Sequence, residues 1–286
     1  MIVYFIKIII LFGIFYIAFL GWLKPTKSFN WNRFYLIFSS LLAVFLPWLE
    51  MPIMRLGKSI QTSENLGAVF NKINTFAESM QANEMHYGKI LFAVYAVGLL
   101  WGLLRFILGL IVLHRIKLSS SIEKIHEQNI YFNENIETPF SYNKNIFIPI
   151  QYKDKEILDA IILHEKAHIV HHHTRDKIYF SILQAVFWFN PFVYIYHKEI
   201  ELMHEFEADE FSASTIGKDI YIENIVNVIS YNQTPTILVH PFFNHSLKNR
   251  ISMLSKQSKN IIIQKLMIIS FTLFISILVL FLQSNV

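Results

Sequence analysis

Two histidines four residues apart, with a glutamate between them, are the residues of this chain best suited to chemistry. They form an H-E-x-x-H run made by His164, Glu165 and His168, inside the stretch 161–173. On a helix, positions four apart share one face, so both imidazoles can bind the same metal ion. Glu165 follows His164 directly and can reach a water molecule on that ion. The run therefore predicts a helix with two metal ligands and a general base.

A catalytic zinc ion commonly has three protein ligands and one position left for water. The acidic segment 198–214, which we predict to be helical, offers candidates for the third ligand. Glu205 and Asp209 share a helix face, which suits one ligand and one carboxylate that orients a histidine ring. Glu201 lies on the same face one turn earlier and is the alternative ligand. Glu207 lies on the opposite side of the helix.

Further histidines lie near both segments. His204 is another candidate ligand on the acidic segment. His171, His172 and His173 raise the hypothesis of a second metal site. We favour a supporting role for His173, near Asp176, either beside the first site or at the end of the helix.

The composition points to a membrane protein. Of 286 residues, 53% are hydrophobic and 16% are charged, and none is cysteine, which excludes disulfides and thiolate zinc ligands. Four apolar runs are candidates for bilayer spans. These runs are 1–23, 34–49 with an extension to about 54, 90–113 and 261–282. We interpret the net charge of +4 as a topology signal rather than as a nucleic-acid footprint.

The segment 178–196 is also apolar enough to cross a membrane. A simple crossing would separate the two histidines from the acidic segment, and the pair Asn190–Pro191 breaks the run. We therefore predict a kinked segment, interfacial, re-entrant or buried, that returns to the same side.

Shorter patterns surround the H-E-x-x-H run. Alternating apolar residues in 130–151 predict β structure, either an edge strand to which a substrate could add or a structural hairpin. Asp154 is the expected N-cap of the helix that carries the run, and residues 174–176 are its expected end.

Three motifs in order make the chain resemble the BlaR/MecR-type membrane metallopeptidases, peptidase family M fifty-six. They are H-E-x-x-H at 164–168, W-F-N-P at 188–191 and E-x-x-A-D at 205–209. The resemblance implies Zn²⁺ as cofactor, Glu205 as its third ligand and Glu165 as the general base. It also implies that an outside signal activates a protease, which cleaves itself or inactivates a transcriptional repressor. Because the sequence ends shortly after the last predicted span, we expect the C-terminal penicillin-binding sensor domain of such proteins to be missing.

We therefore predict a mainly α, multi-pass membrane protein with four main transmembrane helices, a gluzincin-like zinc protease region and a small β element. The positive-inside rule, applied to Lys24, Lys27 and Arg33 in the first loop, places the protease region in the cytoplasm of a bacterium. The expected parts are three spans in 1–113 with an extracytoplasmic loop at about 53–89, the protease region in 114–260, and a fourth span with a short tail in 261–286.

The expected function is regulatory proteolysis at the inner (cytoplasmic) membrane. Expected partners are a protein substrate such as a transcriptional repressor and the lipid bilayer, without direct nucleic-acid contact; a homodimer is compatible with the sequence. One alternative is a membrane-protein quality-control protease of the HtpX type, which shares H-E-x-x-H. Another is a zinc-binding membrane sensor or scaffold that does not cleave.

Overall fold

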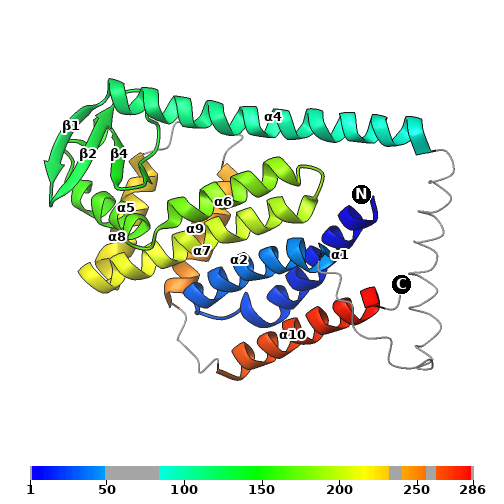
Figure 1. Ribbon diagram of the computed structural model, residues 1–286. Helices are drawn as coiled ribbons and strands as arrows, with labels where there is room; N and C mark the ends of the chain where they lie inside the picture. Colours follow the sequence, from blue (N-terminus) through cyan, green and yellow to red (C-terminus); the bar gives the residue numbers. More distant parts are fainter. Residues whose placement is uncertain (1, 49–83, 232–239, 256–261, 285–286) are drawn as a thin grey trace.

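The computed structural model describes residues 2–48, 84–231, 240–255 and 262–284, which form a mainly helical chain with one small sheet (Figure 1). The helices are α1 (Ile2–Ala18), η1 (Phe19–Leu23), α2 (Phe29–Phe45), η2 (Leu46–Trp48), α4 (Glu84–Ser119), η3 (Ile150–Tyr152), α5 (Leu158–Val170), α6 (His173–Val186), α7 (Pro191–Ile216), α8 (Lys218–Tyr231), α9 (His240–Ser255) and α10 (Ile262–Ser284). The strands are β1 (Ser121–Ile125), β2 (Gln128–Asn133), β3 (Phe140–Tyr142) and β4 (Asn145–Pro149).

Three described helical stretches are long and apolar enough to cross a membrane, and they correspond to the first three predicted spans. They are Tyr4–Leu23, Phe29–Trp48 and Gly88–Ser119. The fourth predicted span coincides with α10. Its described apolar part, Lys265–Ile277, is shorter than the other three stretches, so this span stays a prediction.

The predicted loop at about 53–89 lies largely outside the described residues, and its last residues, from Glu84, begin α4. The predicted boundary after 113 falls inside α4, which continues to Ser119 and leads directly into the sheet.

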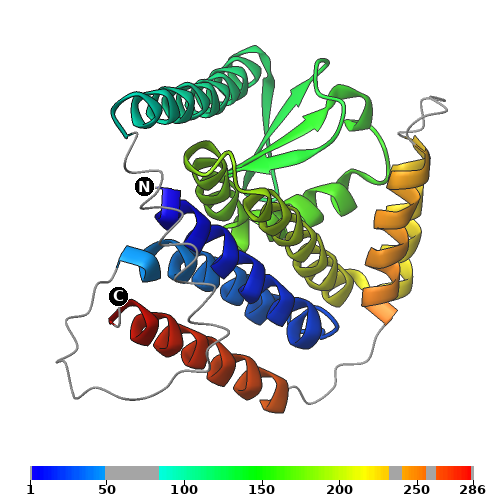
Figure 2. The same cartoon turned by 90° about the vertical axis from the view of Figure 1, so that its right-hand side faces the viewer.

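Helices α6 and α7 form a hairpin at the centre of the molecule. Figures 1 and 2 show this hairpin between α4 and the sheet on one side and α1 and α2 on the other, with α10 beyond them. Helix α7 contacts α1, α2, α5, α6, α8 and α9. Its buried residues Val193, Tyr196 and Ile200 join side chains of α1 and α2 in the main apolar core. Because α7 contacts most other helices, its polar side chains are held in fixed positions relative to the rest of the protein.

The hairpin turn explains why the segment 178–196 returns. The Asn190 side chain accepts a hydrogen bond from the backbone N–H of Phe192 at 3.0 Å, and Pro191 occupies the first helical position. Both features favour a new helix start. The predicted break at Asn190–Pro191 is therefore confirmed. At its other end, α7 stops at Gly217, whose φ of 92° suits glycine.

A close approach packs α4 against the hairpin. A Cβ atom on Gly102 of α4 would lie 2.7 Å from the Cα of Ala185 on α6. Glycine therefore lets these two helices meet at backbone distance.

Two predictions about the ends of α5 were wrong. Asp154 does not cap it, because the backbone N–H of Leu158 is bonded to the carbonyl of Lys155, and Ile157 precedes the helix without a side-chain cap. Residues 174–176 do not end it either. The helix stops at Val170, and His172, in the left-handed region with φ of 58°, separates it from α6. Residues 174–176 belong to the first turn of α6.

The predicted β structure is present in a four-stranded sheet of order β1-β2-β4-β3. The two alternating runs, β2 and β4, pair in parallel rather than as a hairpin, and β3 and β4 form an antiparallel pair. Apolar residues of β2 and β4 pack on Ile161 and Ile162 of α5. Strand β3 lies at the edge of the sheet and contacts α5. Among the described residues, one edge of β3 pairs with no other strand, and this edge lies close to α5.

Candidate metal centre

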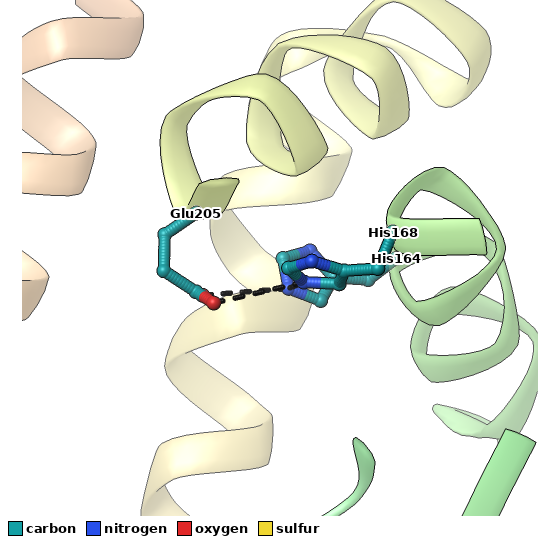
Figure 3. Close-up of side chains that lie close together, drawn as sticks. All are labelled: His164, His168 and Glu205. Atoms are coloured by element: carbon teal, nitrogen blue, oxygen red, sulfur yellow. Dashed lines mark hydrogen bonds and ion pairs between the residues drawn. The ribbon is translucent and has the colours of Figure 1, made fainter. Parts of the chain in front are cut away.

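The structure brings His164, His168 and Glu205 together, and we call these three residues the metal triad. The two histidines lie one turn apart on α5, and Glu205 faces them from α7 (Figure 3). The Nε2 atoms of the histidines are 3.3 Å apart. The carboxylate oxygens of Glu205 lie 3.5 Å from Nε2 of His164 and 3.6 Å from Nε2 of His168.

The metal triad fits a divalent metal ion. One ligand atom from each residue lies within 4.8 Å of the others, so one ion can contact all three. Two imidazole nitrogens and one carboxylate oxygen are a donor set that catalytic zinc uses, with a fourth position left for water. In the part of the chain that the structure describes, no second group of this kind is present.

Electrostatics favour the protonation states that a metal ion requires of two triad members. Burial lowers the pKa of His168 well below its usual value. Burial alone would raise the pKa of Glu205, but hydrogen bonding to His164 and the charge of Arg250 hold it far below the usual range. Burial alone would lower the pKa of His164, but its hydrogen bond to Glu205 raises it. A metal ion requires the neutral imidazole, so metal binding at His164 would compete with the proton that this hydrogen bond favours.

Glu165 lies beside the triad in a buried position, with 6% of its surface exposed. Burial raises the pKa of its carboxyl group, and the neighbouring His164 and a hydrogen bond with Ser141 of β3 oppose the rise. An open pocket of about 190 Å³ is lined by Glu165, two triad residues and Pro139, which precedes β3. The Glu165 carboxyl group, two members of the metal triad and the residue before β3 therefore lie around the same pocket.

The ring of His164 is held by a hydrogen-bond network of Tyr221, Asp209 and Arg250, which we call the His164 network. Nδ1 of His164 lies 2.8 Å from the Tyr221 hydroxyl, which donates to Oδ1 of Asp209 at 2.7 Å. Arg250 donates to both oxygens of Asp209, from Nε at 2.9 Å and from a terminal nitrogen at 2.5 Å. Its other terminal nitrogen lies 3.3 Å from Glu205. Asp209, predicted to orient a histidine, therefore acts chiefly through Tyr221.

The ring of His168 meets a second network, made by His173, Glu207 and Arg33, which we call the His168 network. Nδ1 of His168 lies 2.7 Å from Nδ1 of His173, and Nε2 of His173 lies 2.8 Å from Oε2 of Glu207. Arg33 of α2 donates to the same carboxylate oxygen at 3.1 Å. Burial raises the pKa of Glu207 to about 7, and the charge of Arg33 opposes this rise. His173 thus contacts a triad histidine, and the supporting role expected from the sequence stays a prediction.

The other predicted site residues lie outside the triad. Asp176 contacts His204 at 2.9 Å and Arg33, but neither triad histidine. His204 therefore faces Asp176 rather than the metal triad. Glu201, the alternative ligand, is exposed and lies 3.6 Å from His197.

The hypothesis of a second metal site at 171–173 finds no support in the described residues. His172 is exposed, and Nδ1 of His171 lies 3.9 Å from Glu207. His173 is occupied by its contacts with His168 and Glu207.

Sequence reasoning missed Tyr221, Arg250, Arg33 and the role of Glu207. Arg33 and Arg250 are arginines among lysine-rich flanks of apolar runs. Arginine suits buried bidentate pairs better than lysine does, so the choice of arginine was the available signal. Tyr221 carries no such signal in the sequence.

The fold and the metal triad define a class: a helical protein with long apolar helices that joins an H-E-x-x-H helix to a glutamate of a second helix, as metallopeptidases do. The family described as BlaR1 peptidase M56 matches residues 6–254. The chain therefore belongs to this family of membrane-associated metallopeptidases, as its motifs suggested. A search of curated proteins found no match.

Proposed function

We propose that the chain is a zinc-dependent endopeptidase of a bacterial cytoplasmic membrane, with the metal triad as ligands and Glu165 as general base. The observation that carries this proposal is the metal triad itself, two of whose members, His164 and Glu205, line one open pocket together with the buried Glu165. Family membership supports it, because the matching family is one of metallopeptidases.

A zinc ion held by the metal triad would lower the pKa of a coordinated water and polarise the scissile carbonyl. Glu165 supplies the proton transfers. Its raised pKa lies nearer to neutral pH, where general acid–base catalysis works best. Its carboxylate accepts a proton from the attacking water. The resulting carboxylic acid then donates that proton to the leaving amine nitrogen, and the peptide bond breaks without a covalent enzyme intermediate.

Strand β3 is suited to present the substrate. It is an edge strand, it contacts α5, and Ser141 within it lies near enough to Glu165 to counter the rise in the pKa of that carboxyl group. An extended peptide could add to its free edge through main-chain hydrogen bonds, as in other strand-addition complexes. Such a peptide would run past the pocket that Glu165 lines.

The contacts of the first loop support a cytoplasmic site. Lys24, between η1 and α2, pairs with Glu199 of α7 at 2.5 Å, and Arg33 near the start of α2 reaches Glu207. The loop and the metal triad therefore lie at the same end of the helices. Because positively charged first loops favour the cytoplasmic side, we propose that the triad faces the cytoplasm. A soluble regulator such as a transcriptional repressor is then the proposed substrate.

One observation favours a second candidate, a quality-control protease for membrane proteins. An open groove of about 1220 Å³ lies between α4 and α6. Its α4 wall, from Val97 to Leu113, is mostly apolar, whereas its second wall, from Thr174 to Trp188, mixes polar and apolar side chains. Its lining also includes Phe140, Ser141 and Tyr142 of β3. A segment leaving the membrane could follow this groove to the strand edge beside Glu165.

The substitution Glu165→Gln tests the proposed mechanism. It keeps the shape of the side chain but removes the base, so cleavage should fall by about 10²- to 10⁴-fold while zinc content is unchanged. Zinc per chain and cleavage products are measured in cells and in purified protein. Glu201→Gln, the same change at an exposed glutamate of α7, is the matched control and should behave as wild type. Normal cleavage by Glu165→Gln would contradict the mechanism.

The same pair of strains separates the two candidate functions. A proteome-wide comparison of cleavage products between wild-type and Glu165→Gln cells reports the substrates. A transcriptional repressor among them supports regulation, whereas fragments of damaged membrane proteins support quality control.

A further inference from the structure

A continuous line of polar side chains connects α2, one of the apolar helices, to the metal triad. Arg33 lies at the α2 end of this line and makes three contacts there. Its guanidinium group donates to Asp176 of α6 at 2.5 Å, to Glu207 of α7 at 3.1 Å and to the carbonyl oxygen of His171 at 2.8 Å. One side chain of α2 therefore joins the start of α6, the end of α5 and the middle of α7.

With a metal ion bound to His168, the hydrogen bonds of this line run in one order. His168 turns Nε2 toward the other triad members, so Nε2 is its metal-binding atom and Nδ1 carries the proton. That proton is donated to Nδ1 of His173, so Nε2 of His173 carries a proton and donates to Glu207. The Glu207 carboxylate must then accept, and the Arg33 charge favours its accepting, ionised form.

The surroundings leave Glu207 dependent on Arg33. His173 is 1% exposed and Glu207 is 4% exposed, so water does not compensate the carboxylate. Both His173 and Arg33 contact the same oxygen, Oε2, and within the described residues no hydrogen-bond partner meets Oε1. The ring of His204 stacks on His173 with centroids 4.0 Å apart and restricts its movement. A buried carboxylate that loses its arginine would move to find another partner.

The geometry points to Arg33 as a positioning residue for the metal ligand His168, acting through Glu207 and His173. This inference rests on the proposed metal centre. It assigns to α2, which is long and apolar enough to span a membrane, a direct influence on metal binding. A displacement of α2 against α7 would move the partner of Glu207 and, through His173, the ring of His168.

The test measures zinc affinity rather than cleavage. The full chain is purified in detergent, and its dissociation constant for zinc is obtained by competition with a chromophoric chelator. Arg33→Met should weaken zinc binding by about 10- to 100-fold, the usual effect of losing an outer partner of a metal ligand. Arg175→Met, the same change at an exposed arginine of α6, is the matched control and should bind as wild type. Wild-type affinity in Arg33→Met would overturn the inference.

A second variant covers the case in which Arg33→Met does not fold. Glu207→Gln keeps the contacts of Arg33 with Asp176 and the His171 carbonyl, so folding should persist. Its zinc affinity should fall by about 10-fold, with a changed visible spectrum of the cobalt-substituted protein because the His168 ring is reoriented. Unchanged affinity and spectrum in this folded variant would also overturn the inference.

A double-mutant cycle shows whether Arg33 acts through His173. If it does, His173→Phe combined with Arg33→Met should cost no more affinity than the larger single loss. Additive losses would mean that Arg33 acts by another route. They would overturn this inference but leave the proposed function standing. If the wild-type chain binds no zinc, the proposed function fails and the inference fails with it.

Discussion

The His164 network and the His168 network have the same chemical order but lie in different surroundings. In each, a triad histidine meets a polar ring, then a carboxylate, then an arginine. Tyr221 and Arg250 of the His164 network line the open pocket. His173 and Glu207 of the His168 network do not line this pocket and lie between α2, α6 and α7, although Tyr221 and Asp209 are buried as deeply as they are.

This difference shows what each network ties to the metal triad. The His164 network reaches α8 and α9, which border the pocket, and its arginine also contacts the third triad member, Glu205. The His168 network reaches α2 through Arg33, and none of its residues lines the pocket. The triad is therefore held from the side of the open pocket by one network and from the apolar helix α2 by the other. Removing single members of each network can separate the two influences.

The largest effect is expected where both networks meet. Glu205 contacts both triad histidines and Arg250, so Glu205→Ala should weaken zinc binding by more than the roughly 100-fold that outer partners cost. Chelator competition on the purified chain measures it, with Glu201→Ala of the same helix as control. Unchanged zinc affinity in Glu205→Ala, or a comparable loss in Glu201→Ala, would move the third ligand to Glu201.

The carboxylates of the two networks should differ in their effect on stability. Asp209→Ala leaves Arg250 with Glu205 as its remaining carboxylate, and breaking such a buried pair costs about 3 kcal/mol. Glu207→Ala should cost less, because Arg33 keeps Asp176 and a backbone carbonyl. Denaturant unfolding of the metal-free protein compares the two. A larger loss for Glu207→Ala would reverse this order.

Tyr221 and His173, the residues that contact the triad histidines directly, should differ in their effect on metal binding. Tyr221→Phe removes only the hydroxyl, and Oδ1 of Asp209, already 3.7 Å from Nδ1 of His164, can partly replace it. We expect a loss in zinc affinity near 10-fold, the lower end for an outer partner. His173→Phe has no such substitute nearby and should lose more, toward about 100-fold. Chelator competition ranks the two variants, and equal losses would contradict the expected difference between the two networks.

The two histidines of the metal triad followed from a short motif and helix periodicity. Periodicity left Glu201 open beside Glu205, and the family resemblance favoured Glu205. The sequence also predicted the return at Asn190, because the chemistry required both halves of the site on one side. It placed Glu207 correctly on the other face of α7 from Glu205, but that face meets His173 and Arg33 rather than solvent. Tyr221 and Arg250 reach the site only through the packing of α8 and α9 on α7, which no local pattern encodes.

The smallest effect is expected at the start of α7, outside both networks. Asn190→Ala removes the side-chain cap on the N–H of Phe192, which should lower stability by about 1 kcal/mol. Zinc affinity should stay within about twofold of wild type, because neither network includes this turn. Unfolding and chelator competition on the same preparation measure both values. If zinc affinity fell together with stability, the position of α7 as a whole would control the triad, and the separate influences of the two networks would have to be abandoned.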